Sequence, residues 1–308
     1  MAATTSIVRI GEMRCGVGES PIWHRAERAL YWTDIVGRRL WRWDASTGHT
    51  HAWALPEMAG SFAFVEQGGI ALAMETGVYL MAQPTPDEPM TSGGCLAMVV
   101  HAAEDMRFND GRCDRQGRFI GGTMVRDMAL ARAAGRLYRL DAGRHKLHVL
   151  CDDLIVPNGL AFSPDGRTMY LSDSHPSRRV IWSFDYDVDD GVPHGRRVFV
   201  EMPASSQLGR PDGAAVDAQG CYWICGNDAG LVHRFTPSGK LDRSIAVPVA
   251  KPAMCAFGGA QMDTLFVTSI RVEGDALSGA TFALDAGVEG LPEPMLRLPS
   301  DAAQAGGA

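Results

Sequence analysis

A repeat of about forty to fifty residues runs through the chain and constrains its fold more than any other feature. Each copy begins with a polar residue, continues through a short apolar run and a turn, and ends with two further short β-forming runs. Clear copies start at Glu19, Asn158 and Asp212, and weaker copies start near Ser61, Asn109 and Met254. Six units of this length, each with three or four short strands, are typical of a propeller. The sequence therefore predicts an all-β fold, a six-bladed β-propeller.

The two ends of the chain are expected to meet in the last blade. The opening run Ser6-Ile-Val-Arg and the late run Phe282-Ala-Leu-Asp are both short and apolar enough to be strands of that blade. We predict one propeller domain over residues 1–299. Residues 300–308, rich in Ala and Gly, are predicted to be a flexible C-terminal tail.

Charge and composition exclude several classes of partner. The chain carries 29 Lys and Arg against 36 Asp and Glu, a net charge of −7, with both signs interspersed. It therefore has no basic stripe for nucleic acid and no polybasic patch for a membrane surface. A small-molecule ligand fits better, and we expect a monomer or a weak homo-oligomer.

The chain also has the features expected of a cytoplasmic protein. The segment from Met1 to Met13 contains Arg9 and Glu12 and lacks the apolar run of a signal peptide. No apolar stretch approaches the about eighteen residues that a membrane-spanning helix needs. The seven cysteines are an odd number and are widely scattered, which favours reduced thiols.

The starts of the repeats are predicted to form one ring of polar side chains. In a propeller the innermost strand of every blade lines the central channel, so equivalent repeat positions face the same ring. Taken singly, an Asn or Asp before Gly is usually a turn residue. Acids and amides from several blades on one ring are stronger evidence for a metal site, because converging carboxylates repel one another unless a cation lies between them. The ring therefore indicates an oxygen-ligand site for one divalent metal ion, Ca²⁺, Mg²⁺, Mn²⁺ or Zn²⁺.

Several motifs resemble those of the senescence-marker-protein/gluconolactonase family, the regucalcin-like sugar lactonases. They extend over roughly Gly16 to Leu296 and are Gly18-Glu-Ser-Pro-Ile-Trp, Arg107-Phe-Asn-Asp-Gly-Arg, Gly117-Arg-Phe-Ile-Gly-Gly-Thr-Met, Asn158-Gly-Leu-Ala-Phe-Ser-Pro-Asp-Gly, Pro211-Asp-Gly-Ala-Ala-Val-Asp-Ala-Gln-Gly and Cys255-Ala-Phe-Gly-Gly. The resemblance implies a six-bladed propeller, in agreement with the repeat.

The resemblance also assigns roles to residues of this chain. It implies that Glu19, Asn158 and Asp212 are the metal ligands, and these are ring positions already selected. It makes Arg107 and Asn109 substrate contacts. An acidic residue soon after Gly-Thr-Met contacts sugar hydroxyls in some members, and Asp127 is the nearest match, although Val125 and Arg126 depart from the family pattern.

These residues are suited to opening a lactone. Three protein ligands leave positions free on a metal ion, which can then polarise a carbonyl. The carboxylate of Asp212 could act catalytically by accepting a proton from the attacking water. Arg107 offers a planar fork of donors for hydroxyl or carbonyl groups.

The leading hypothesis is a metal-dependent lactonase that converts an aldonolactone to the aldonic acid in sugar catabolism. The alternatives are a calcium-binding, regucalcin-like regulatory protein, or a related propeller esterase or phosphotriesterase. The particular lactone and the native metal stay open.

Overall fold

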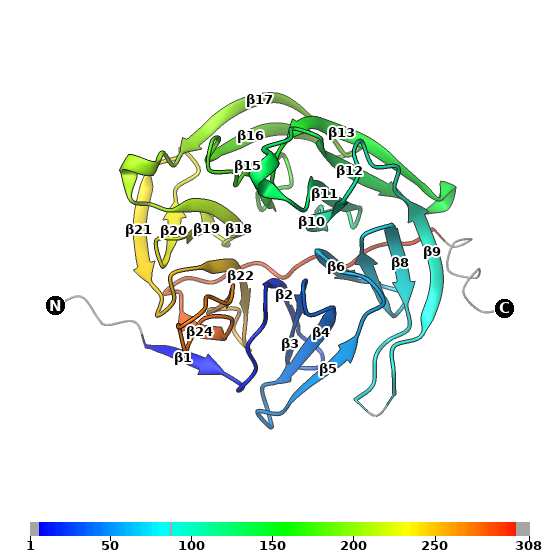
Figure 1. Ribbon diagram of the computed structural model, residues 1–308, viewed down its shortest axis with the longest axis horizontal. Coiled ribbons are helices and arrows are strands. Elements are labelled where there is room, and N and C mark those ends of the chain that lie inside the picture. The colour runs from blue at the N-terminus through cyan, green and yellow to red at the C-terminus, as the bar shows by residue number, and fades with distance from the viewer. Residues whose placement is uncertain (1–5, 87, 300–308) are drawn as a thin grey trace.

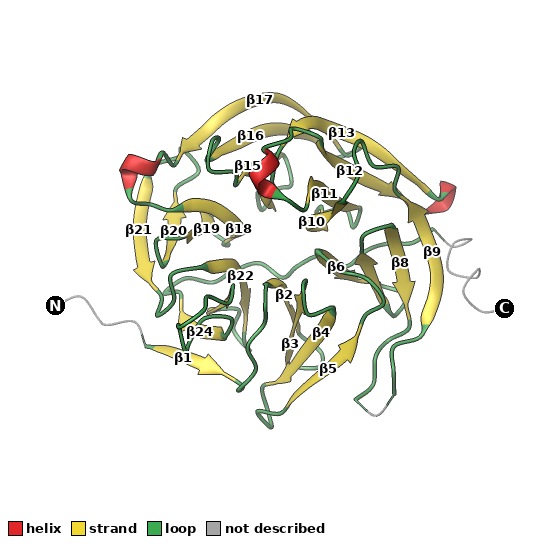
Figure 2. Ribbon diagram, viewed as in Figure 1, coloured by secondary structure: helices red, strands yellow, loops and turns green. Residues whose placement is uncertain are grey.

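Six four-stranded antiparallel sheets surround a central axis in the computed structural model, which describes residues 6–86 and 88–299 (Figures 1 and 2). The predicted all-β fold with six blades is therefore confirmed. The predicted tail at 300–308 lies outside the described residues, and the predicted domain boundary at residue 299 stays a prediction.

The first three blades follow one another along the chain. The first contains β2 (Gly18–His24), β3 (Ala29–Asp34), β4 (Arg39–Asp44) and β5 (Thr50–Ala54). The second contains β6 (Ser61–Phe64), β7 (Ile70–Ala73), β8 (Gly77–Met81) and β9 (Ser92–Met98). The third contains β10 (Met106–Cys113), β11 (Phe119–Val125), β12 (Gly135–Asp141) and β13 (Lys146–Leu154).

The remaining blades complete the ring. The fourth contains β14 (Pro157–Phe162), β15 (Thr168–Asp173), β16 (Val180–Asp187) and β17 (Val192–Glu201). The fifth contains β18 (Arg210–Val216), β19 (Tyr222–Asn227), β20 (Leu231–Phe235) and β21 (Leu241–Ala246). The sixth contains β22 (Pro252–Gly258), β23 (Thr264–Ser269), β24 (Thr281–Asp285) and, as its outer strand, β1 (Ile7–Ile10).

The sixth blade joins the two ends of the propeller, as predicted. Strand β1 pairs antiparallel with β24, with Ile7 opposite Leu284 and Ile10 opposite Thr281. In the described part of the chain, three short 3₁₀ turns lie outside the sheets, η1 (Met128–Leu130), η2 (Ala142–Arg144) and η3 (Ala204–Ser206). Within the described residues, no helix is both long and apolar enough to cross a membrane.

The chain after β24 crosses the axis at one end of the channel (Figure 1). Gly290 bridges to Asp217 of the fifth blade and Leu296 to Val65 of the second blade. Asp217 and Val65 each follow the end of an inner strand, β18 and β6. The crossing segment therefore lies opposite the end at which the inner strands begin.

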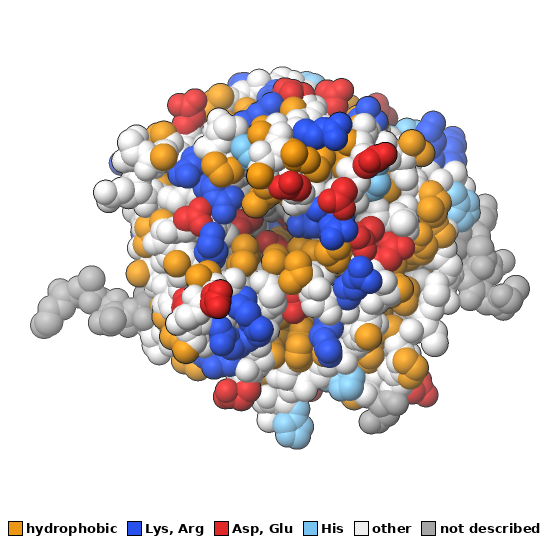
Figure 3. Space-filling model, in the orientation of Figure 1, with side chains coloured by type: hydrophobic (Ala, Val, Ile, Leu, Met, Phe, Trp, Pro, Cys, Tyr) orange, Lys and Arg blue, Asp and Glu red, His pale blue; other side chains and the backbone are white. Residues whose placement is uncertain are grey.

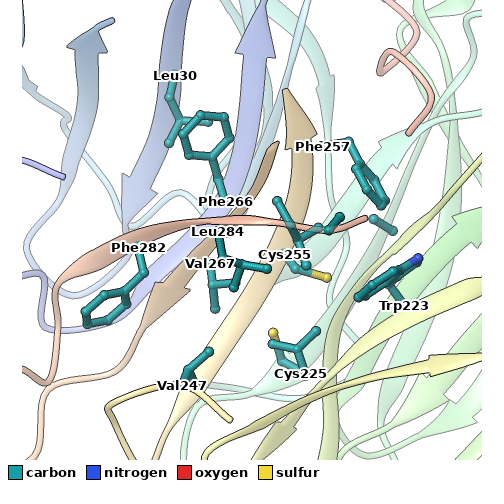
Figure 4. Packing of buried hydrophobic residues seen from close by; sticks show 14 of the residues in the cluster. Leu30, Trp223, Cys225, Val247, Cys255, Phe257, Phe266, Val267, Phe282 and Leu284 are labelled. Carbon is teal, nitrogen blue, oxygen red and sulfur yellow. The ribbon is translucent and has the colours of Figure 1, made fainter. Parts of the chain in front are cut away.

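The hydrophobic core lies between neighbouring blades. One cluster combines residues of the first, fifth and sixth blades, among them Leu30, Trp223 and Phe282, which are almost fully buried (Figure 4). Trp23 of β2 stacks on Phe266 of β23 with ring centroids 5.5 Å apart. Such contacts fix the inner strands of adjacent blades relative to one another.

Candidate metal and substrate site

Five of the six inner strands carry a β-bulge near the channel entrance. In β2, Glu19 pairs with Thr33 and the next pair is Ile22 with Tyr31, so the inner strand has one extra residue. The same extra residue occurs in β10, β14, β18 and β22, whereas β6 pairs regularly. A bulge re-aims side chains at the point where it interrupts the ladder. The predicted ring residues all lie at these points or, in β6, at the first residue of the strand.

Four of the six ring positions line one cavity of about 270 Å³ at the axis: Glu19, Asn109, Asn158 and Asp212. The ring prediction is therefore correct for four blades. Ser61 and Met254 are buried but do not line the cavity. Gly213 lies so close to Met254 that a Cβ at this glycine would meet the Met254 side chain.

The carboxylate of Asp212 lies between two asparagine side chains. The Nδ2 of Asn158 donates to its Oδ1 over 2.7 Å, and the Nδ2 of Asn227 donates to its Oδ2 over 2.6 Å. Burial raises the pKa of Asp212 to about 7, although the nearby Arg210 cation lowers it. Burial also raises the pKa of Glu19 well above its ordinary value, and the Asp212 and Asp110 carboxylates raise it further. Ionising both acids therefore requires a compensating positive charge.

The residues around these acids fit a divalent cation. The Oδ1 of Asn158 is buried and has no hydrogen-bond partner, although a buried amide oxygen normally has one. Within the described residues, no three His, Cys, Asp or Glu side chains cluster at metal-binding spacing, so an ion here would need the amide oxygen of Asn158 as well. Two carboxylates and an amide supply only oxygen, which suits Ca²⁺, Mg²⁺ or Mn²⁺ better than the softer Zn²⁺.

Arg107 and Asn109 are held together beside this group. One Nη of Arg107 donates to the Oδ1 of Asn109 over 2.7 Å and to the backbone oxygen of Phe108 over 2.8 Å. The Nδ2 of Asn109 donates to the oxygen of Pro157, which directly precedes Asn158. Burial lowers the pKa of Arg107 to about 10, and the guanidinium stays charged at neutral pH. Both side chains line the cavity and have donors available for a ligand.

Comparison with known proteins identifies the family. Residues 17–271 match the family model described as the SMP-30/gluconolactonase/LRE-like region. The chain belongs to this family. A 6-deoxy-6-sulfogluconolactonase of Pseudomonas putida is 41% identical over 286 residues, 91% of this chain and 94% of that protein. A pentonolactonase of Haloferax volcanii is 30% identical over 299 residues, 94% of this chain and 97% of that protein.

A solved structure supports the same assignment. The regucalcin of Agrobacterium tumefaciens, described as a calcium-binding protein, is 28% identical and superposes with a TM-score of 0.86. The superposition covers 96% of this chain and 98% of that one. The resemblance seen in the sequence motifs is therefore confirmed.

Asp127 lies differently from the other residues that the SMP-30/gluconolactonase resemblance selected. Its side chain is exposed, and its Oδ1 accepts from the backbone N–H of Ala129, so that it caps the turn η1. The cavity is lined instead by the neighbouring Met128. Contact between Asp127 and a substrate stays a prediction to which this geometry adds no support.

Asn227 was missed by the sequence reasoning. Asp34 and Asp173, at the ends of β3 and β15, accept backbone N–H groups from the chain entering the inner strand of their own blade. Asn227 ends β19 at the equivalent place but donates to Asp212 instead. The recurrence of Asp or Asn at this repeat position was the available signal. In this member of the SMP-30/gluconolactonase family, Asn227 thus orients the Asp212 carboxylate.

Proposed function

We propose that the protein hydrolyses a sugar lactone to the aldonic acid, as a step of sugar catabolism, with one divalent cation held by Glu19, Asn158 and Asp212. The observation that carries this proposal is the unpartnered, buried Oδ1 of Asn158 beside two carboxylates of raised pKa. The names of the two lactonase relatives support the same reaction. A cavity of about 270 Å³ is at the small end of ligand sites and suits a monosaccharide.

Each of these groups would have a separate role in the reaction. A bound cation would supply Lewis-acid polarisation of the lactone carbonyl. Arg107 and Asn109 would orient the sugar through its hydroxyl and carbonyl oxygens. Asp212 would take a proton from the attacking water as the new carbon–oxygen bond forms. When the ring carbon–oxygen bond breaks, the same carboxyl would return that proton to the leaving ring oxygen, so no other reactant is needed.

The substrate class is proposed from the most similar of these relatives. The Pseudomonas putida protein is named for a gluconolactone that carries a sulfonate at its terminal carbon. We propose that this chain also acts on a six-carbon aldonolactone, with a five-carbon lactone as the alternative that the Haloferax volcanii relative suggests.

A calcium-binding regulatory protein is the second candidate. The all-oxygen donor set and the calcium-binding description of the Agrobacterium tumefaciens structure favour it. Against it, a buffering calcium site takes six or more oxygens, whereas this group offers three protein side chains and a ligand-sized cavity. A related propeller esterase or phosphotriesterase would share the site and differ only in substrate.

Cellular location and assembly are also proposed. We infer a cytoplasmic monomer or weak homo-oligomer. The seven cysteines, all free and five of them buried, support a reducing compartment.

The experiment is a panel of aldonolactones, simple esters and phosphotriesters assayed by proton release. Each is tested with chelator, then with Ca²⁺, Mg²⁺, Mn²⁺ or Zn²⁺ restored. We expect lactone turnover that needs the cation, and Asn158→Ala should weaken both turnover and cation affinity by at least about tenfold. Ser61→Ala, at a ring position outside the cavity, is the matched control and should change neither. Cation binding without hydrolysis of any lactone would support the regulatory alternative instead.

A further inference from the structure

In three blades a basic residue occupies the same position of the inner strand, directly before the last regular pair that precedes the bulge. Arg210 pairs with Asn227 immediately before the last regular pair of β18 and β19. Arg107 pairs with Met124 at the equivalent point of the third blade. In the sixth blade the backbone oxygen of Lys251 accepts from the N–H of Ile270. All three side chains line the cavity. The repeat therefore places three cations directly outside the ring of acids and amides.

A fourth cation, Arg271, faces the cavity from the junction of the sixth and first blades. Its backbone N–H donates to the oxygen of Gly16, and one Nη donates to the oxygen of Arg14 over 2.6 Å. The backbone of Arg271 is thus anchored, and its exposed guanidinium is bonded to the carbonyl of Arg14. Because Ile270 pairs with Lys251, Arg271 and Lys251 project from adjacent chain segments. Both residues line the cavity from these neighbouring segments.

The charges at the mouth are only partly compensated. Asp228 pairs with both Arg210 and Lys251, so one carboxylate serves two cations. Among the described residues, no carboxylate pairs with Arg271 or with Arg107. The cavity is lined by four cations and two carboxylates, and the two carboxylates are those of the proposed cation site. Figure 3 shows Lys and Arg side chains around the central hollow of this face.

We propose that Arg271 and Lys251 form an anion subsite that binds the negatively charged terminal group, a sulfonate or a phosphate ester, of the lactone substrate. This rests on the proposed function, since the lactone ring would lie deeper, beside Arg107, Glu19 and Asp212. A guanidinium and an ammonium that line the same cavity suit a tetrahedral anion, because both can donate charge-assisted hydrogen bonds to its oxygens. Because positive charge is in excess at the mouth, a negatively charged lactone should bind more tightly than the corresponding neutral lactone.

Steady-state kinetics test the subsite with matched substrates. Gluconolactone, its 6-phosphate and its 6-sulfonate are compared in the wild type, Arg271→Gln and Lys251→Gln. We expect the wild type to prefer both charged lactones. Arg271→Gln should raise KM for them about tenfold with kcat unchanged, and should change the neutral lactone less than about twofold. Arg179→Gln is the control, because Arg179 also donates to a backbone carbonyl but lies outside the cavity.

The outcomes separate the subsite from the lactonase proposal. Equal losses on charged and neutral lactones would mean that Arg271 only shapes the cavity, and a wild type that prefers the neutral lactone would also refute the subsite. A difference between the phosphate and the sulfonate identifies the preferred anion. Equilibrium binding of gluconate 6-phosphate against gluconate needs no turnover. If no lactone is hydrolysed, the subsite is still supported when gluconate 6-phosphate binds more tightly than gluconate and Arg271→Gln abolishes this difference. Equal binding of the two ligands by the wild type overturns the subsite.

Discussion

Replacing Asp212 by Asn is expected to stabilise the cation-free protein at neutral pH, although it removes a proposed ligand. The substitution keeps the volume and the hydrogen bond from Asn227 but removes the charge. The second bond, from Asn158, is restored if that amide turns, because its Oδ1 has no other partner. The buried charge, rather than a lost contact, therefore dominates the effect.

The magnitude follows from the pKa of Asp212. Burial raises it from 3.8 in the unfolded chain to about 7 in the folded one. Between these values the unfolded chain is ionised at this position while the folded protein keeps its proton. The unfolded state then binds fewer protons, so the free energy of unfolding falls as pH rises and levels off above about pH 7. A pKa change of this size corresponds to on the order of 4 kcal/mol.

Urea denaturation in chelator, followed by tryptophan fluorescence between pH 4.5 and 8, measures this effect. Wild type and Asp212→Asn should have similar stability near pH 4.5 and diverge in favour of the variant as pH rises. Glu19, whose pKa the Asp212 charge raises, also changes in the variant and in the same direction, so the difference reports on this pair of buried acids. Saturating Ca²⁺ should make the wild type more stable than the variant, because only the wild type keeps all of the proposed metal ligands.

Asp228→Asn is the control, and its effect on the free energy of unfolding should be opposite in sign to that of Asp212→Asn. Burial raises the pKa of Asp228, but its ion pairs with Arg210 and Lys251 outweigh burial and hold it below its ordinary value. Its stabilising contribution is present above the unfolded pKa and is lost as pH falls, so the variant should be less stable than wild type at neutral pH. Parallel pH curves for wild type and Asp212→Asn would refute the reasoning about the buried charge.

Two further predictions concern the supports of the site and are checked by the same denaturation. Gly159→Ala should cost about 3 kcal/mol, because φ is +59° and the new Cβ would lie 2.5 Å from the Tyr222 hydroxyl; Gly48→Ala, at φ +73° with open space around it, should cost only about 1 kcal/mol. Glu293→Ala should cost about 3 kcal/mol, because it leaves the buried Arg112 without its 2.9 Å ion pair, whereas Glu293→Gln, which keeps an oxygen acceptor for Arg112, should cost less. A Gly159→Ala cost no larger than that of Gly48→Ala, or a Glu293→Gln variant as unstable as Glu293→Ala, would contradict the respective argument.

The blade count and the identity of the inner strands could be predicted because they depend on local sequence alone. A polar start, a short apolar run and a turn recur within each unit, and every recurrence marks one inner strand of the structure. The pairing of β1 with β24 could also be predicted, since two unpaired short strands remained at the ends of the chain.

Residues that reach the cavity from outside the inner strands could not be found in this way. Arg271 follows β23, and its direction depends on bonds to Gly16 and Arg14, more than 250 residues away in the sequence. For Asp127, the motif could not show which way the side chain turns. Asp is a favoured capping residue, and here the local hydrogen bond to the turn η1 satisfies its carboxylate.

The register of the inner strands is the deeper limit of the sequence reasoning. The sequence repeat makes Glu19, Asn109, Asn158 and Asp212 equivalent. Their positions in the hydrogen-bonded pairing of the inner strands are not equivalent. Glu19 and Asn158 are the last regularly paired residues before their bulges, whereas Asn109 and Asp212 lie within theirs.

In a regular strand a shift of one residue turns a side chain to the opposite face. The extra residue of the bulge removes this alternation locally, so that both kinds of position reach the same cavity. A polar start identifies the strand, but only the pairing with its neighbour determines which side chain reaches the axis. The bulges therefore bring neighbouring positions of several blades to one cavity, and the different residue types at those positions make the site asymmetric.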